Sequence, residues 1–330
     1  MDSSSRLIAG MRAARVVVVG DLIADQFILG RVERVSREAP VLILQYDRTT
    51  IVPGGAGNAA ANAAALGAKV DIVGLVGRDD EGARLLKRLS ARANVRRVVR
   101  AAGYATTVKT RILAGGVHSA KQQVVRIDKT SPAVTPAMRR RLQAALTRAA
   151  RNADAIIVSD YGGGVVTPAM VQRAVRAAGR RKPLVLVDSR YGMLGFAGMT
   201  ATTPNESEVE AQLGVKIGDD AAALERAGRA LLAKTKAQAV LITRGSRGMA
   251  LFERARPTEH IPIVGSDEVA DVTGAGDTVI ATFTLALAAG ASFLDAAHLA
   301  NHAGGIVVMK QGTATVSRAE LAGSVAAHGR

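Results

Sequence analysis

Short apolar runs alternate with helical segments along most of this chain. Val16–Val19 is an uninterrupted apolar run that ends at Gly20-Asp21, which is typical of a strand buried on both faces of a parallel sheet. Similar runs follow at Val70–Val76, Ala155–Val158, Leu184–Val187 and Ala239–Thr243. Helices are predicted between and after them at Ala56–Leu66, Glu81–Ala93, Pro168–Ala178, Glu206–Leu213, Ala221–Ala233 and Thr278–Ala289. The alternation predicts an α/β fold, with right-handed crossovers and a parallel sheet covered by helices on both faces.

Two stretches interrupt this alternation with strands that have no helix between them. Arg31–Thr50 contains the apolar run Val41–Leu44, and Ala105–Asp128 contains strand-like runs at Thr106–Leu113 and Gln122–Ile127. Two such excursions predict a small β lid, formed by residues 31–50 and 105–128, over the mouth of the sheet. A lid of this kind would exclude water from phosphoryl-transfer chemistry.

Composition narrows the class of protein. The 330 residues are 48% apolar and 22% charged, which excludes general disorder, and we expect a single domain over residues 1–330. The absence of cysteine excludes disulfides and thiolate metal sites and fits a cytoplasmic protein. The longest uncharged run, Val279–Leu294, is shorter than the ~20 apolar residues of a membrane span and is expected to be a buried helix. Met1–Arg15 lacks the apolar core of a secretory signal and is expected to be a tail.

The charge balance is strongly positive. Lys and Arg number 44 and Asp and Glu 28, so the net charge is +16, which suggests polyanions or phosphorylated small molecules as partners. The cations are dispersed, Trp is absent, and four Tyr and five Phe leave little for stacking on bases. Nucleic acid is therefore not the expected partner, and an arginine-rich solvated surface is the simplest alternative.

The segment Asp271–Asp277 is a glycine-rich turn that leads into an apolar helix. The backbone N–H groups of Gly274, Ala275 and Gly276 would form an anion site at the helix N-terminus. Asp277 lies in the first turn, where its carboxylate could take the proton of an alcohol that attacks phosphorus. The alternative is an ordinary helix start with a favourable Asp. The segment fits neither a dinucleotide fingerprint nor a P-loop, because the third glycine and a Gly-Lys pair are missing.

Two further polar segments are candidates for substrate binding. Gly54 and Gly55 would let the backbone approach a ligand, and Asn58 could hydrogen-bond vicinal hydroxyls. Asp21 and Asp25 follow the first strand, at the carboxyl edge of the sheet where α/β folds bind ligands. These carboxylates suit sugar hydroxyls and a metal ion equally well.

A third pair of segments suits a nucleotide. Asn205 and Glu208 are three residues apart on one helix face and could order water around Mg²⁺ at a triphosphate. An ordinary helix cap is the alternative for this pair. Thr243–Gly248 follows a strand and is expected to be either a nucleotide phosphate loop or a tight hairpin.

The order of these segments resembles that of the ribokinase (PfkB-type) carbohydrate kinases. Gly-Gly-x-Gly-Asn lies at 54–58, Asn-x-x-Glu at 205–208 and Asp-x-Thr-Gly-Ala-Gly-Asp at 271–277, so the resemblance covers nearly the whole chain. It implies a ribokinase-like three-layer α/β/α fold and an ATP-dependent sugar kinase that uses Mg²⁺. Further segments are similar to the D-glycero-β-D-manno-heptose 7-phosphate kinase branch; they lie at 20–21, 34–40, 53–56, 159–161, 203–205, 301–308 and 310–313.

The resemblance also implies residue roles. It makes Asp277 the base and the backbone of 274–276 the anion hole. It assigns the sugar to Asp21, Asp25, Gly54, Gly55, Asn58, Lys109, Arg111 and Asp160. It assigns MgATP to Asn205 and Glu208, the nucleotide to Thr243, Gly245, Gly248 and Asn301, and a monovalent cation such as K⁺ to Asp271 and Thr273.

Three departures from the heptose branch concern the substrate pocket. Gly163 stands where a lysine is usual, Asp188–Tyr191 replaces Asp-Pro-Lys-Gly, and Ala114–Ser119 lengthens the lid. Neutralisation of a substrate phosphate would therefore fall to Arg190 and to the lid cations Lys109, Arg111 and Lys121. Many members of the branch carry a second, nucleotidyltransferase domain, and this chain is expected to contain the kinase half.

The resulting hypothesis is transfer of the ATP γ-phosphate to the anomeric hydroxyl of a heptose 7-phosphate. Another sugar or sugar acid is the alternative substrate. A catalytically silent sugar or nucleotide sensor and a polyanion-binding protein are the alternatives outside enzymes. We also expect two copies of the chain to pair through the lid.

Overall fold

The computed structural model describes residues 3–115, 121–265, 271–310 and 312–328. Among them, eight strands form one sheet in the order β14-β13-β12-β11-β10-β9-β1-β4. The neighbours from β12 to β4 are parallel, and β13 and β14 add an antiparallel edge, so the prediction of a mainly parallel sheet is confirmed. The bounds are β1 Arg15–Gly20, β4 Lys69–Val73, β9 Ala155–Asp160, β10 Leu184–Ser189, β11 Ala201–Thr202, β12 Ala239–Thr243, β13 Met249–Glu253 and β14 Glu259–Ile261.

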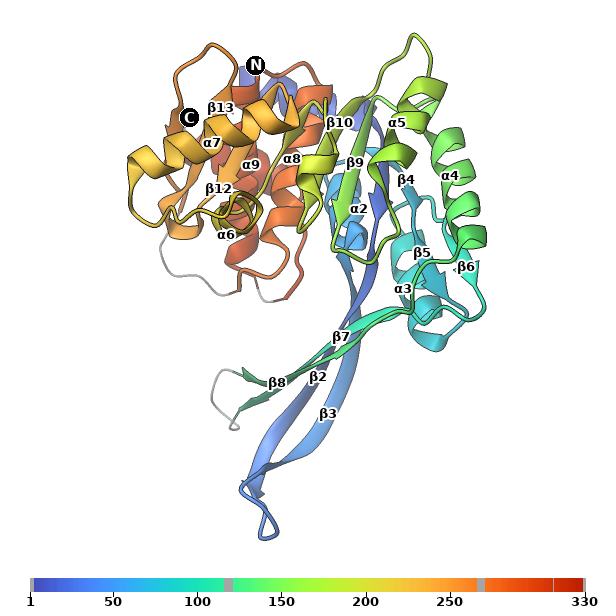
Figure 1. Ribbon diagram of the computed structural model, residues 1–330. Coiled ribbons are helices and arrows are strands. Elements are labelled where there is room, and N and C mark those ends of the chain that lie inside the picture. Colours follow the sequence, from blue (N-terminus) through green and yellow to red (C-terminus); the bar gives the residue numbers. More distant parts are fainter. Residues whose placement is uncertain (1–2, 116–120, 266–270, 311, 329–330) are drawn as a thin grey trace.

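Helices cover both faces of this sheet, which gives three layers (Figure 1). Alternate residues of β1 show the division: Val16 and Val18 pack into one apolar core, and Val17 and Val19 into the other. One face carries α1 Ser3–Gly10, α2 Ala56–Ala65, α3 Asp80–Ser90, α8 Ala275–Ala288, α9 Phe293–Val308 and α10 Arg318–His328. The other carries α4 Pro136–Ala150, α5 Pro168–Ala177, α6 Glu206–Leu213 and α7 Ala221–Thr235.

A separate four-stranded sheet projects from the main body (Figure 1). Its order is β3-β2-β7-β8, with bounds β2 Leu22–Val35, β3 Leu42–Gly55, β7 Thr107–Gly115 and β8 Gln122–Lys129. This sheet, called the lid below, spans the segments for which a lid is predicted. It starts at Leu22 rather than at residue 31, because β2 runs on directly from the end of β1. The predicted lengthening at Ala114–Ser119 lies mostly outside the described residues.

Other expectations for the chain need correction. The predicted N-terminal tail contains α1 and the 3₁₀ turn Met11–Ala13, because Ile8 and Met11 are buried in the core. The predicted strand at Val70–Val76 is divided into β4 and β5 (Leu75–Gly77), which pairs with β6 (Val99–Ala101). Helix α8 begins three residues before the predicted Thr278. No helix among the described residues is long and apolar enough to span a membrane.

Candidate active site

A cleft of about 450 Å³ opens where the carboxyl edge of the main sheet, the base of the lid and the N-terminus of α8 meet. The strand register explains why acidic residues gather there: Gly20 and Asp188 both pair with Ser159, so the residues that follow β1, β9 and β10 lie side by side. The cleft is lined by Ile23, Asp25, Gly55, Lys109, Arg111, Arg126, Asp160, Tyr161, Asp188, Arg190, Thr203, Asn205, Glu208, Thr243, Val272, Thr273, Gly274, Gly276, Asp277 and Thr313.

Asp277 is the buried carboxyl at the bottom of this cleft. Its Oδ2 accepts a hydrogen bond from Asn58 Nδ2 at 3.0 Å, and its Oδ1 accepts one from the Tyr161 hydroxyl at 3.2 Å. Burial raises the pKa of Asp277 to about 7. The two hydrogen bonds and the positive charge of Lys109 act in the opposite direction and limit this rise. A carboxyl of this pKa can accept a proton near neutral pH.

The turn before Asp277 depends on glycine. Gly274 has a φ of +81°, and a Cβ there would lie 2.4 Å from Asn58 Nδ2. Asn58 Nδ2 donates to the Gly274 carbonyl as well, at 3.2 Å, and Asn58 Oδ1 accepts from Asn62 Nδ2 at 3.1 Å. One amide therefore fixes both the turn and the carboxyl. The N–H groups of Gly276 and Asp277 belong to the first turn of α8, where no helix carbonyl precedes them.

Asp21 and Asp25 both lie at the lid side of the cleft. Asp21 Oδ2 accepts the backbone N–H groups of Tyr161 and Gly163, at 2.7 and 3.0 Å, and burial raises the pKa of Asp21. Its Oδ1 is buried and has no hydrogen-bond partner among the described residues. Asp25 pairs with Arg111 at 2.6 Å, and both side chains are largely buried.

Gly54 and Gly55 lie beside these carboxylates. A Cβ on Gly54 would lie 2.1 Å from Asp25 Oδ2, so only glycine lets the chain approach that carboxylate. Gly55 has a φ of +56°, and a Cβ there would lie 2.6 Å from the Asp21 carbonyl oxygen.

Four cations line the cleft: Lys109, Arg111 and Arg126 come from the lid, and Arg190 directly follows β10. Arg111 pairs with Asp25, and Arg126 pairs with Asp128, with 2.8 Å between Arg126 Nε and Asp128 Oδ1. Lys109 Nζ lies 5.1 Å from the centre of the Tyr161 ring, and burial together with the Arg126 and Arg190 charges lowers the pKa of Lys109 against the opposing effect of Asp25. Arg126 was not predicted as a site residue. It lies opposite Arg111 in the pairing of β7 with β8, and both side chains line the cleft. Lys121 pairs instead with Asp47, at 2.6 Å, and does not line the cleft.

The opposite end of the cleft is acidic. Asp188 is half-buried, and the charges of Glu208, Asp277 and Asp160 add to its loss of hydration in raising the pKa of Asp188 well above its usual range. Burial also raises the pKa of Glu208. Carboxylate oxygens that repel one another in this way suit a hard divalent cation such as Mg²⁺, because the positive charge of the ion offsets the repulsion. Asp188 and Tyr161 were not predicted as site residues. Their positions at the ends of β10 and β9 could have indicated them, because ligands bind at the carboxyl edge of such a sheet.

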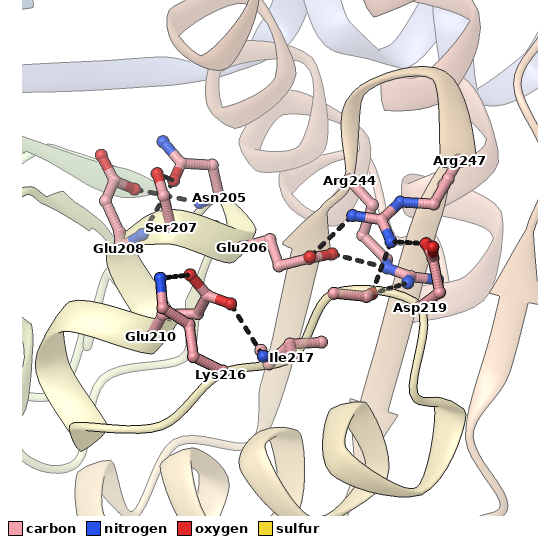
Figure 2. Close-up of polar contacts among 11 residues, drawn as sticks. Asn205, Glu206, Ser207, Glu208, Glu210, Lys216, Ile217, Asp219, Arg244 and Arg247 are labelled. Atoms are coloured by element: carbon pink, nitrogen blue, oxygen red, sulfur yellow. Dashed lines mark hydrogen bonds and ion pairs between the residues drawn. The ribbon is translucent and has the colours of Figure 1, made fainter.

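Asn205 and Glu208 also form a capping box at the start of α6 (Figure 2). The Glu208 N–H donates to Asn205 Oδ1 at 2.9 Å, and the Asn205 N–H donates to Glu208 Oε2 at 3.0 Å. The cap expected as the alternative is thus present. Both side chains also line the cleft, so Asn205 and Glu208 remain candidate site residues although they cap the helix.

The neighbouring Glu206 joins α6 to the turn after β12 (Figure 2). Glu206 accepts Arg244 Nε at 2.9 Å and an Arg247 guanidinium N–H at 2.7 Å. Arg247 also pairs with Asp219 at 2.6 Å. The side chains of Glu206 and Arg244 are only 13% and 12% exposed, so their ion pair is largely shielded from water, unlike an ion pair on the surface. It fixes Asn205 and Glu208 relative to the turn that contains Gly245.

Other candidates are structural neighbours of the cleft. Asn301 Nδ2 donates to the Pro262 carbonyl at 2.7 Å, and a Cβ on Gly248 would lie 2.0 Å from the Ile261 carbonyl oxygen. Gly245 and Gly248 have φ of +58° and +75° in a tight turn between β12 and β13. Thr243 lines the cleft, whereas Gly245, Gly248 and Asn301 do not.

Asp160 and Asp271 each stabilise a turn by accepting backbone N–H groups. Asp160 accepts the Gly162 N–H at 3.0 Å and the Ser189 hydroxyl at 2.7 Å. Asp271 accepts the Thr273 N–H at 2.9 Å and the Gly312 N–H at 3.0 Å, and its pKa lies below the usual value because these contacts outweigh burial. Asp160 and Thr273 still border the cleft.

The family follows from comparison with known proteins. A model described as pfkB family carbohydrate kinase matches residues 13–320. This chain belongs to the pfkB family of carbohydrate kinases. As a member of this family, the chain is an ATP-dependent sugar kinase.

Its curated relatives include longer proteins. Bifunctional protein HldE of Caulobacter vibrioides is 42% identical over 323 residues, which are 97% of this chain and 65% of that protein. Bifunctional protein HldE of Geobacter sulfurreducens is 42% identical over 322 residues, covering 97% of this chain and 64% of that protein. The pfkB kinase thus spans a little less than two thirds of the length of these relatives.

Solved structures confirm the ribokinase-like fold. Arabidopsis thaliana ribokinase complexed with ribose and ATP superposes with a TM-score of 0.72 at 19% identity, covering 95% of this chain and 99% of the other. Phosphofructokinase-2 from Escherichia coli in complex with fructose-6-phosphate gives 0.75 at 17% identity, covering 96% and 99%.

The contacts of the pfkB kinase predict how Asn58 acts on Asp277. Asn58→Ala removes a hydrogen bond that favours the charged carboxylate, so the pKa of Asp277 should rise above about 7. Carbon-13 NMR titration of the aspartate carboxyls measures this shift directly. Asn94→Ala, whose amide pairs with the distant Asp71, is the control and should leave the Asp277 titration unchanged. A lowered or unaltered pKa in Asn58→Ala would contradict the assignment.

Proposed function

We propose that this kinase transfers the γ-phosphate of ATP to the anomeric hydroxyl of a heptose 7-phosphate. The observation that carries the proposal is the composition of the cleft: Lys109, Arg126 and Arg190 line it together with the buried carboxyl of Asp277. A phosphorylated sugar needs cations for its phosphate at one end and a base for its hydroxyl at the other. The resemblance to the heptose 7-phosphate kinase branch selects the heptose among phosphorylated sugars.

The proposed step begins at Asp277. The sugar hydroxyl oxygen bonds to the γ-phosphorus, the bond from that phosphorus to its bridging oxygen breaks, and ADP leaves. The hydroxyl proton passes to the Asp277 carboxylate, which Asn58 and Tyr161 hold in place. The N–H groups of Gly276 and Asp277 in the first turn of α8 would stabilise the negative charge on the transferred phosphoryl group, whereas the Ala275 N–H donates to the Val272 carbonyl at 3.2 Å.

The proposed substrate contacts follow from the same arrangement. Asp21, Asp25, Gly54, Gly55 and Asn58 would contact the sugar; of these, Asp25 and Gly55 line the cleft. The sugar phosphate would bind Lys109, Arg126 and Arg190. The acceptor hydroxyl and the nucleotide would then meet at Asp277.

The nucleotide would bind at the α6 end, near Asn205 and Thr243. Asn205, Glu208 and Asp188 would hold Mg²⁺, in part through water, and the ion would neutralise charge on the phosphates. A monovalent cation beside Asp271 and Thr273 belongs to the same proposal, supported by the ionised Asp271.

We further propose that two copies pair through the lid. Support comes from large apolar residues on its strands that are exposed in a single chain; they include Val35, Leu42, Val125 and Ile127.

The role of Asp277 predicts both a rate loss and a pH profile. Asp277→Asn should retain the fold and lose ~10²–10⁴ in kcat, the usual contribution of a positioned base. In the wild type, kcat/KM should fall as the pH drops below about 7, because Asp277 is then protonated and unable to accept the hydroxyl proton. Steady-state kinetics from pH 5.5 to 8.5 measure both. A folded Asp277→Asn variant with wild-type turnover would refute the assignment.

The proposed metal contact predicts a separable effect. Glu208→Gln removes the charge but keeps a side chain that can complete the capping box, so α6 should remain intact. We expect a higher Mg²⁺ concentration for half-maximal rate and little change in the KM for the sugar. Glu210→Gln on the same helix, which does not line the cleft, is the matched control. An unaltered Mg²⁺ titration in Glu208→Gln would reduce the pair to a helix cap.

The substrate proposal predicts a preference for the phosphorylated sugar. Heptose 7-phosphate should show a higher kcat/KM than the unphosphorylated heptose, and Lys109→Ala should erode that ratio by about 10–100-fold, since a hydrogen bond to a charged group is removed. Lys121→Ala, a lid lysine paired with Asp47, should leave the ratio unchanged. An ADP-release assay measures all three ratios. Equal kcat/KM for the two wild-type substrates would reject the phosphosugar while leaving the sugar kinase intact.

A further inference from the structure

A second cavity lies on the other side of the lid base from the reaction cleft. It has a volume of about 790 Å³ and is bounded by α3, by the part of β3 nearest the main body and by residues 313–315. Figure 1 shows α3 beside the base of the lid. The volume falls within the ~300–1,000 Å³ of small-molecule sites. Neither the sugar proposal nor the nucleotide proposal uses this space.

Positive charge concentrates on one wall of this cavity. Arg84, Lys87 and Arg88 come from α3, and Arg92 follows the helix. Arg84 pairs with Asp80, at 2.8 Å, and Arg92 donates to the Thr315 hydroxyl at 3.3 Å. Within the described part of the chain, Lys87 and Arg88 have no ion-pair partner, and no acidic side chain lines the cavity. The wall therefore carries cations whose charge the surrounding protein leaves largely uncompensated.

The remaining walls suit a ligand with both anionic and uncharged parts. Thr49, Thr50 and Thr315 supply hydroxyl groups, which can donate to phosphate oxygens. Pro53, Leu89 and Ala93 supply apolar surface. Guanidinium and ammonium groups bind phosphate more strongly than neutral donors do.

We propose that this space, the basic cavity, binds a phosphate-bearing small molecule at a site separate from both substrates of the kinase reaction. The phosphate would lie against Lys87, Arg88 and Arg92. The uncharged part would pack against Pro53 and Leu89. A bound anion would remove the mutual repulsion of these cations.

The basic cavity lies next to the catalytic centre, and Asn58 and Thr313 lie between the two. Asn58 lines the basic cavity and donates to Asp277 Oδ2. Thr313 lines both spaces, and its Cγ2 lies 3.2 Å from where a Cβ on Gly274 would stand. A ligand in the basic cavity would therefore be separated from Asp277 by the Asn58 side chain.

Calorimetric titration with inorganic tripolyphosphate tests the proposal on the full chain. A non-hydrolysable ATP analogue and heptose 7-phosphate, both at saturating concentration, first occupy the nucleotide and sugar-phosphate parts of the reaction cleft, so that the probe meets the remaining site. We expect one tripolyphosphate per wild-type chain. Lys87→Ala/Arg88→Ala should weaken its binding by at least about tenfold, because two charge-assisted contacts are lost.

The matched control removes two charges elsewhere. Arg140→Ala/Arg148→Ala changes two exposed arginines of α4, which line none of the cavities described here, and should leave tripolyphosphate binding unchanged. Equal weakening in both double variants would overturn the proposal, since it would show attraction to the net charge of +16 rather than to a site. Absence of binding beyond the analogue-occupied cleft would overturn it as well. Unchanged unfolding temperatures without the probe establish that both variants are folded.

Discussion

The buried carboxyl of Asp277 is the constraint on which the site depends. A carboxyl in this position loses hydration, and burial alone would keep it protonated at neutral pH. Asn58 and Tyr161 restore part of the lost hydrogen bonding, and each comes from a different element: α2 begins just before Asn58, and β9 ends just before Tyr161. The start of α8, the start of α2 and the end of β9 must therefore meet within hydrogen-bond distance. The parallel sheet between its two helical layers satisfies that requirement.

Charge is distributed along the cleft in the order that phosphoryl transfer needs. Lys109, Arg126 and Arg190 raise the positive potential at the lid end, while Asp188 and Glu208 repel one another at the α6 end. Burial is the largest cause of the lowered pKa of Lys109 and of the raised pKa of Asp188, and nearby like charges add to both shifts. A dianionic group near Lys109 and a divalent cation near Asp188 would offset the part of each shift that like charges cause.

The sequence was sufficient where a signal is local. The apolar runs marked β1, β4, β9, β10 and β12, and the glycine-rich turns marked the starts of α2 and α8. It was insufficient where a residue gains its place from long-range packing. The tail prediction failed because Ile8 and Met11 are buried against distant elements, which no local pattern reveals. Arg126 and Asp188 were missed for the same reason: the pairing of β7 with β8 and of β9 with β10 brings them to the cleft.

Gly163 shows how one position shapes the surroundings of Asp21. A Cβ at residue 163 would lie 2.5 Å from Asp21 Oδ1, so a side chain there is incompatible with the position that Asp21 occupies. With glycine, the backbone N–H approaches Asp21 Oδ2 to 3.0 Å. Oδ1 remains without a hydrogen-bond partner among the described residues, and burial raises the pKa of Asp21. A buried acceptor without a donor favours a ligand that supplies one, and a sugar hydroxyl can donate at that point without bringing in a charge.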